Sequence, residues 1–101
     1  MSTYKDLEMK IIQWGEARGI VQQSTPEAQW EKTWEETNEL LDAIMEKNTA
    51  KMKDAYGDIL VTLIIGCATA DIDLTECLEL AYNEIKDRKG SLNADGIWVK
   101  Q

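Results

Sequence analysis

Five acidic side chains form two short clusters that together could bind a metal ion. Glu35, Glu36 and Glu39 form an EExxE motif, and Asp54 and Asp58 follow in a later segment. At about 100° of turn per residue, Glu36 and Glu39 lie about 60° apart on a helix, and Asp54 and Asp58 share one face. Carboxylate oxygens are the ligands that Mg²⁺ and Mn²⁺ prefer. The two clusters therefore predict a divalent-metal site, provided that the elements carrying them pack together.

The composition excludes several other kinds of chemistry. The sequence contains no histidine, which excludes Ser-His-Asp and Cys-His catalysis and zinc sites that need imidazole. Cys67 and Cys77 lie in apolar surroundings and form no CxxC pair, so we interpret them as reduced core residues. The apolar run from Ile59 to Ala70 is too short to span a bilayer, and Met1 to Asp6 does not resemble a signal peptide. We expect a cytoplasmic protein that does not contact membranes.

Length and charge restrict the partners. The chain has 101 residues, enough for one domain over 1–101, and a formal net charge of -8. This charge disfavours direct contact with nucleic acid, and a phosphate ligand would need a divalent cation between itself and the protein. A chain this short also buries more apolar surface when it associates with copies of itself. We therefore expect a homodimer or homotetramer.

Four helices separated by short turn signals must position the acidic residues. Apolar residues at helical spacing predict helices over 3–22, 24–47, 50–70 and 74–88, followed by a tail over 91–101. Gly15 and Gly19 weaken the end of the first helix. Before Pro26 a hydroxyl cap is expected, with Ser24 and Glu27 as a possible capping box. Strand-like alternation is absent, so the predicted fold class is all-α, a four-helix bundle-type chain.

The apolar stripes predict which helix faces point inward. In the second helix the stripe contains Trp30, Trp34, Thr37, Leu41 and Ile44, and in the fourth it contains Leu78, Ala81, Tyr82 and Ile85. We also expect Trp98 in the tail to pack on the bundle or on a partner subunit.

A short connection brings the two acidic clusters together. The second and third helices are joined by Lys47–Thr49 and should pack antiparallel. From Ile59 onward the third helix is apolar on all sides, which is typical of a buried element. Asp58 opens that stretch, and a buried carboxylate must be paired, protonated or bound to metal. The alternative interpretation of EExxE alone is a solvated acidic face.

The ordered set of motifs resembles a known family. EExxE on one helix, followed after a hairpin by an aspartate that opens an apolar helix, is similar to the MazG-type all-α nucleoside triphosphate pyrophosphohydrolases, whose pattern is EExxE followed by ExxD. Several other segments resemble short phage and prophage members of that family: Gln29-x-x-Lys32, Leu40-Leu41, and residues 53–61, 84–90 and 95–100. The glutamate of ExxD is replaced here by Ala55. Asp54, one residue earlier, is the candidate substitute; without it one ligand is missing.

The resemblance implies Mg²⁺-dependent hydrolysis of nucleoside triphosphates, with dNTPs or non-canonical nucleotides as substrates, to a monophosphate and pyrophosphate. Mn²⁺ is a possible replacement for Mg²⁺. The metal ligands would be Glu36, Glu39 and Asp58, with Asp54 as the fourth candidate, and Glu35 would orient or deprotonate the attacking water. The candidate substrate-binding residues for the phosphates are Lys32, Asn83, Lys86 and Arg88. For the base, Trp14, Trp30 and Trp34 are available, and Trp30 is the preferred candidate because it lies one turn before the acidic cluster.

Two other functions fit parts of the sequence. An acidic helical partner protein that mimics DNA or inhibits a nucleic-acid-binding protein would suit the net charge of -8. A purely structural helical oligomer would leave the facing acidic clusters unexplained. The distribution of charge distinguishes these functions, because a DNA mimic needs carboxylates spread over its outer surface and an enzyme needs them clustered.

Overall fold

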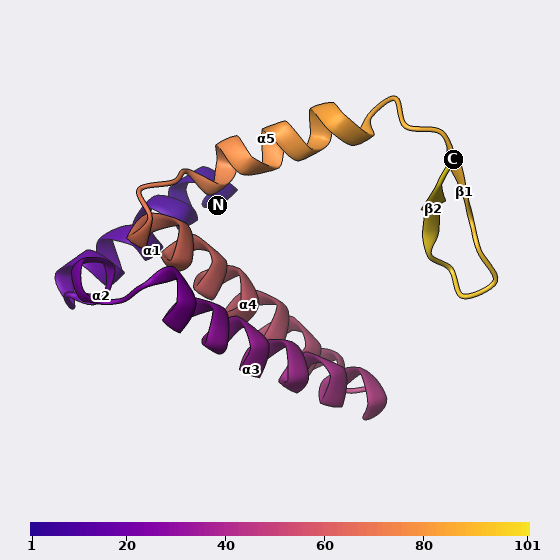
Figure 1. Ribbon diagram of the computed structural model, residues 1–101. Helices are drawn as coiled ribbons and strands as arrows, with labels where there is room; N and C mark the ends of the chain where they lie inside the picture. Colours follow the sequence, from indigo (N-terminus) through magenta and orange to yellow (C-terminus); the bar gives the residue numbers. More distant parts are fainter.

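The computed structural model describes residues 1–101 as five helices followed by a small β-hairpin (Figure 1). The predicted all-α class is confirmed for the body of the chain. The elements, in chain order, are α1 (Tyr4–Ala17), α2 (Ile20–Gln23), α3 (Pro26–Met45), α4 (Thr49–Thr69), α5 (Leu74–Ile85), β1 (Gly90–Leu92) and β2 (Trp98–Lys100).

The first predicted helix is divided into α1 and α2. Thr3 begins α1 with a capping box, because its side chain accepts from the Asp6 amide and the Asp6 side chain accepts from the Thr3 amide. Gly19 adopts φ 74°, the left-handed region that glycine enters without steric cost, and separates the two helices. The weakness expected at the end of this helix is therefore a true break.

The start of α3 lies one residue later than the Ser24 capping box would place it. Thr25 is the N-cap, and its hydroxyl accepts from the Ala28 amide at 3.1 Å. Pro26 fixes the first helical position, which leaves Thr25 as the residue that can cap. The Ser24 hydroxyl accepts instead from the Gln29 side chain at 3.0 Å, so the predicted box with Glu27 is wrong.

An antiparallel hairpin of α3 and α4 is the framework of the molecule (Figure 1). Lys47 turns the chain with φ 55°, and the Asn48 side chain caps α4 by accepting from the Lys51 amide at 3.0 Å. Near the middle of the hairpin the Thr33 and Thr62 hydroxyls are 2.8 Å apart and hydrogen-bonded. The predicted antiparallel pairing of these helices is confirmed.

The inner face of α3 differs from the predicted stripe. Trp30 and Trp34 are 65% and 60% exposed, and Thr37, Leu41 and Ile44 are exposed as well. The more buried face carries Gln29, Thr33, Glu36, Leu40 and Ala43. Small side chains such as those of Ala43 on α3 and Ala55 on α4 are buried here, and they allow a close approach that indole rings would prevent. The prediction that the tryptophan stripe is buried is therefore wrong for the single chain.

Burial of α4 is one-sided. Ala55, Thr62, Ile64 and Ile65 are buried, whereas Leu60 and Leu63 are 38% and 40% exposed. Besides α3, it packs against α1, α2 and the beginning of α5. The expectation that this helix is buried on all sides is therefore only partly met by one chain.

The C-terminal elements project away from the hairpin (Figure 1). Helix α5 leaves α4 at an angle of 106°, and apart from its beginning, where the Thr75 hydroxyl donates to Glu8 of α1, it packs against no other helix. Its predicted inner stripe of Leu78, Ala81, Tyr82 and Ile85 is exposed. No single helix is long and apolar enough to cross a membrane; only α4 and α5 taken together, across their bend, have the length and composition for it.

The tail forms an antiparallel β-hairpin that the sequence analysis did not predict. Ser91 pairs with Val99, and Leu92 with Trp98. The missed signal is Asp95-Gly96, a turn dipeptide between two apolar segments, in which Gly96 adopts φ 78°. Trp98 packs against Gly90, where an added Cβ would lie 2.8 Å from the indole ring, and it remains 53% exposed. It contacts no helix of its own chain.

Candidate active site

Three carboxylates meet between the two helices of the hairpin. Glu36 and Glu39 from α3 and Asp58 from α4 each offer an oxygen atom, and these atoms all lie within 4.8 Å of one another. Glu36 belongs to the inner face of α3, which turns the EExxE motif toward α4. The structure thus brings together three of the four residues proposed as metal ligands.

Electrostatics in this carboxylate cluster oppose full ionisation. Burial, followed by the neighbouring Glu39 and Asp58 carboxylates, raises the pKa of Glu36 above its ordinary value. Burial, followed by the Asp54 and Glu39 charges, raises the pKa of Asp58. One oxygen of Glu36, Oε2, is buried and has no hydrogen-bond partner. A cation between the three groups would relieve both the repulsion and the unpaired oxygen.

The donor set fits a hard divalent cation. Three carboxylates from two rigid helices provide oxygen ligands only, without the sulfur or nitrogen atoms that favour zinc. Mg²⁺ is commonly held by a few carboxylates and completes its octahedron with water or phosphate oxygens. Glu36, Glu39 and Asp58 are therefore the residues that would hold the metal.

Asp54 lies outside the carboxylate cluster. It is exposed, and it acts on Asp58 through charge. Ala55, which stands where the family pattern has glutamate, is 4% exposed at the wall of a cavity of about 320 Å³ that Glu39 and Asp54 also line. The cavity is open beside the position that a longer side chain at residue 55 would occupy. Asp54 does not enter the cluster in this arrangement.

Glu35 points to a different partner. Its Oε2 atom lies 2.8 Å from Lys32 Nζ, and both side chains are more than half exposed. The Glu35 carboxylate raises the pKa of Lys32, mainly through this hydrogen bond. The structure thus shows Glu35 paired with Lys32, whereas its action on water stays a prediction.

The basic residues of α5 do not reach the carboxylate cluster of their own chain. Asn83, Lys86 and Arg88 are exposed, and Arg88 lies 4.0 Å from Glu84 as a weak ion pair. No contact joins α5 to α3, because the bend after α4 carries α5 away (Figure 1). Within one chain these residues and the metal ligands remain apart.

A cavity of about 430 Å³ opens directly onto the carboxylate cluster. Glu36 and Asp58 form part of its lining. The remaining lining is a mixture of apolar, aromatic and polar side chains: Trp14, Ile20, Gln29, Lys32, Val61, Thr62 and Ile65. The sequence offered Trp14 as one of three tryptophans for the base but favoured Trp30, because only the tertiary contact between α1 and α4 brings α1 beside the acidic residues. It gave Gln29 no role in the site.

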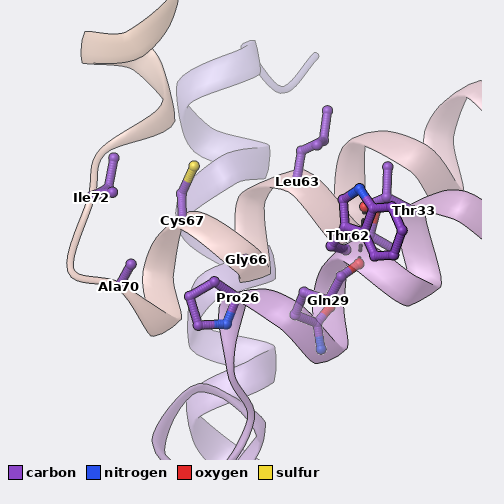
Figure 2. Close-up of a pocket in the computed structure, with 10 residues that line it drawn as sticks. Pro26, Gln29, Thr33, Thr62, Leu63, Gly66, Cys67, Ala70 and Ile72 are labelled. Carbon is purple, nitrogen blue, oxygen red and sulfur yellow. Dashed lines mark hydrogen bonds between the residues drawn. The ribbon is translucent and has the colours of Figure 1, made fainter.

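Trp30, the tryptophan selected from the sequence, lines another cavity. This cavity of about 280 Å³ lies where the beginning of α3 meets the end of α4, and its lining is mainly apolar (Figure 2). Leu63, Cys67 and Ile72 contribute to its wall, and none of the three clustered carboxylates does.

Both Cys67 and Cys77 are free thiols and half-buried.

Glu8 is a buried carboxylate that sequence reasoning missed. It is 2% exposed and accepts hydrogen bonds from the Thr75 hydroxyl at 2.9 Å and from Lys5 Nζ at 3.3 Å. The bond from Thr75 joins α1 to the beginning of α5, and the bond from Lys5 lies within α1, so Glu8 has a structural role. Its only sequence signal is Lys5 three residues earlier.

Family comparison agrees with the all-α fold. The family model described as the MazG nucleotide pyrophosphohydrolase domain matches residues 24–92, so the chain belongs to this family. It is also 34% identical over 73 residues to an uncharacterized 18.2 kDa protein from the rep-hol intergenic region of Haemophilus phage HP1. That match covers 72% of this chain and 45% of the phage protein, so the chain spans less than half the length of this relative. No solved structure matches the chain significantly.

The raised pKa values predict an unusual pH dependence of stability. Because the folded state binds protons more tightly at Glu36 and Asp58 than the unfolded state does, their contribution is most favourable in acid. In EDTA, this contribution to the free energy of unfolding should fall as pH rises from the ordinary carboxylate range through the raised values. Excess Mg²⁺ should reverse the trend, since metal and protons compete for the same oxygens. Denaturant unfolding of the wild type and of Glu36→Gln at a series of pH values measures this dependence. If the free energy of unfolding changed with pH equally in both proteins, the raised pKa would not belong to Glu36.

Proposed function

We propose that this protein hydrolyses nucleoside triphosphates, with dNTPs or non-canonical nucleotides as substrates, to monophosphate and pyrophosphate with Mg²⁺, or Mn²⁺, as cofactor. The observation that carries the proposal is the carboxylate cluster between α3 and α4, in which Glu36 Oε2 is buried without a hydrogen-bond partner and Glu36 and Asp58 line a cavity. Membership of the MazG nucleotide pyrophosphohydrolase family supports the reaction class.

In the proposed reaction, residues of the chain would hold the metal, orient the phosphates and accept a proton from the attacking water. A bound divalent cation would neutralise phosphate charge and acidify a water molecule. Water attacks the α-phosphorus, the bond to the bridging oxygen breaks, and pyrophosphate leaves with that electron pair. Lys32 lies at the cavity wall and can bond to a phosphate oxygen in place of Glu35. Glu35, once released from Lys32, accepts the proton of the attacking water.

The leaving pyrophosphate requires more positive charge than Lys32 supplies. Lys86 and Arg88 are the next candidates, but they lie on an element that turns away from the carboxylate cluster of the same chain. Helix α5 also exposes Leu78 by 63% and Tyr82 by 60%, an apolar surface that a second copy can cover. We therefore propose a homo-oligomer, a dimer or tetramer, in which α5 of one subunit contributes its cations and Asn83 to the site of another.

The charge distribution favours an enzyme over an acidic DNA mimic. A mimic acts through carboxylates on its outer surface, whereas here Glu36 lies on the face of α3 that packs against α4. Placing a carboxylate there without a ligand costs stability. No observation favours the mimic specifically.

The proposal is tested by pyrophosphate release from a panel of NTPs and dNTPs in Mg²⁺, in Mn²⁺ and in EDTA. We expect monophosphate and pyrophosphate in equal amounts with either metal and none in EDTA. Folded, oligomeric protein that releases pyrophosphate from no nucleotide would refute the proposal. Release of orthophosphate would indicate attack at the γ-phosphorus and a different reaction.

A further inference from the structure

We propose that Cys67 and Cys77 are a redox modification site, which a low-molecular-weight disulfide such as oxidised glutathione converts into an intramolecular disulfide bond. The bond joins the end of α4 to the beginning of α5. Cys67 follows Asp58 by nine residues, which is about 14 Å along the axis of α4. The modification therefore lies away from the carboxylate cluster and does not depend on the proposed function.

The turn between α4 and α5 places the two cysteines at adjoining helix ends. Cys67 lies in the last turn of α4 and Cys77 in the first turn of α5, and the two helices are in contact. The Cys67 carbonyl accepts hydrogen bonds from the Ala70 amide at 3.1 Å and from the Ile72 amide at 2.8 Å. These bonds hold the turn close to Cys67, so the chain that leads to Cys77 starts beside the first thiol.

The two thiols interact across this junction. Burial raises the pKa of the Cys67 thiol, and Cys77 raises it further through its charge and through a hydrogen bond between the two side chains. Since the sulfur atoms already adjoin each other, a small movement brings them to bonding distance. Both residues are half-buried, and Cys67 also lines the cavity of about 280 Å³ (Figure 2). A small disulfide can therefore reach them.

A second set of contacts holds the same junction in place. The Thr75 hydroxyl donates to the buried Glu8 carboxylate at 2.9 Å, and the Asp73 side chain accepts from the Thr75 amide at 2.9 Å. These bonds fix the first turn of α5, which carries Cys77, against α1. One thiol is thus held beside the other, and such proximity favours reaction between the two over reaction with a second molecule.

The proposed reaction is a thiol–disulfide exchange in two steps. The Cys77 thiolate attacks one sulfur of glutathione disulfide, whose S–S bond breaks, and one glutathione leaves with the electron pair and takes up a proton. The Cys67 thiolate then attacks the Cys77 sulfur of the mixed disulfide and releases the second glutathione in the same way. Cys67 reacts second because its raised pKa leaves less of it as thiolate. Two cysteine thiols are oxidised, and glutathione disulfide is reduced to two thiols.

The disulfide restrains the direction of α5. In the reduced chain, this helix is held only at its beginning, by α4 and by the bond to Glu8. The new bond closes a loop over residues 67–77, across the 106° bend between the helices. A cross-link of this kind removes conformations from the unfolded chain and so stabilises the folded one. Oxidation therefore reduces the freedom of α5 relative to the α3–α4 hairpin.

The test exposes the wild type to glutathione buffers from fully reduced to fully oxidised, followed by acid quenching, alkylation of free thiols and mass spectrometry. We expect a form that has lost two hydrogen atoms and carries neither glutathione nor the alkyl group. Asp71 and Asp73 lie between the cysteines, so cleavage at aspartate yields two peptides that stay linked until they are reduced. The melting temperature of this form should be higher by about 5 °C or more, and dithiothreitol should remove the increase.

Cys67→Ser and Cys77→Ser are the matched controls. Each should bind one glutathione at its remaining thiol, more slowly at Cys67, and neither should gain the same melting temperature. Wild type that binds two glutathiones, that forms disulfides only between chains, or whose thiols stay free in fully oxidised glutathione would overturn the proposal. An intramolecular disulfide without stabilisation would overturn the restraint on α5. None of these measurements uses metal or nucleotide, so failure of the proposed function is detected separately.

Discussion

Replacing Glu36 with glutamine is expected to reduce nucleotide turnover by more than about a hundredfold, the upper range for losing a group that only supports a metal ligand. The substitution keeps the shape of the side chain and removes one of three oxygen ligands from the carboxylate cluster. The same change should raise the melting temperature in EDTA. It removes a charge that is partly desolvated and repelled by Glu39 and Asp58. Mg²⁺ should then stabilise the variant less than it stabilises the wild type.

Glu31→Gln is the matched control for this experiment. Glu31 is an exposed glutamate on the same helix and does not belong to the carboxylate cluster. We expect its turnover and its Mg²⁺ stabilisation to equal those of the wild type. A Glu36→Gln protein that melts at a lower temperature in EDTA, or that keeps its turnover, would show that the carboxylate has a structural role.

Two inactive variants are expected to restore each other when they are assembled together. Glu36→Gln removes a metal ligand, and the double change Lys86→Ala with Arg88→Ala removes the cations of α5. If each site combines the carboxylate cluster of one subunit with α5 of another, mixed assemblies contain some sites with neither change. Each mixed dimer of twofold symmetry has one intact site and one doubly changed site, so about half of the sites in the doubly purified protein are intact. Co-expression with two affinity tags, followed by pyrophosphate release from the doubly purified protein, measures the recovery.

The controls for this complementation separate assembly from catalysis. Lys10→Ala removes an exposed lysine on α1 and should leave turnover unchanged. Size-exclusion chromatography with light scattering should show that all variants have the oligomeric state of the wild type. Assembled mixtures without activity would place the cations and the carboxylates of each site on one chain. Full activity of the double variant alone would show that Lys86 and Arg88 do not contribute to the site.

The α3–α4 hairpin and its acidic residues could be predicted because each signal is local. Asn48 caps α4 by accepting a hydrogen bond from the amide three residues later. The connection between α3 and α4 has only three residues, and helices joined by so short a loop pack antiparallel. EExxE and Asp58 therefore face one another once the hairpin forms. Family membership could be predicted from the same ordered residues, and the family match over residues 24–92 confirms it.

Side-chain burial could not be predicted with the same success, because it depends on which surfaces meet. The tryptophan stripe of α3 and the apolar stripe of α5 have the correct periodicity for a core, and both lie exposed in the single chain. Periodicity shows that a helix has an apolar face, but not which element covers it. Ala43 and Ala55 are buried where α3 packs on α4, and small side chains at such positions allow two helix backbones to approach closely.

The sequence by itself determined the helices, the hairpin and the residues able to bind a divalent metal, since these depend on spacing along one or two adjacent elements. Only the tertiary structure decided the neighbours of that site. Close packing at Gly15 brought Trp14 beside the acidic residues, and the 106° bend after α4 carried Lys86 and Arg88 away from them. Both outcomes depend on contacts between residues that are distant in sequence, and the residue pattern of a single helix does not predict such contacts.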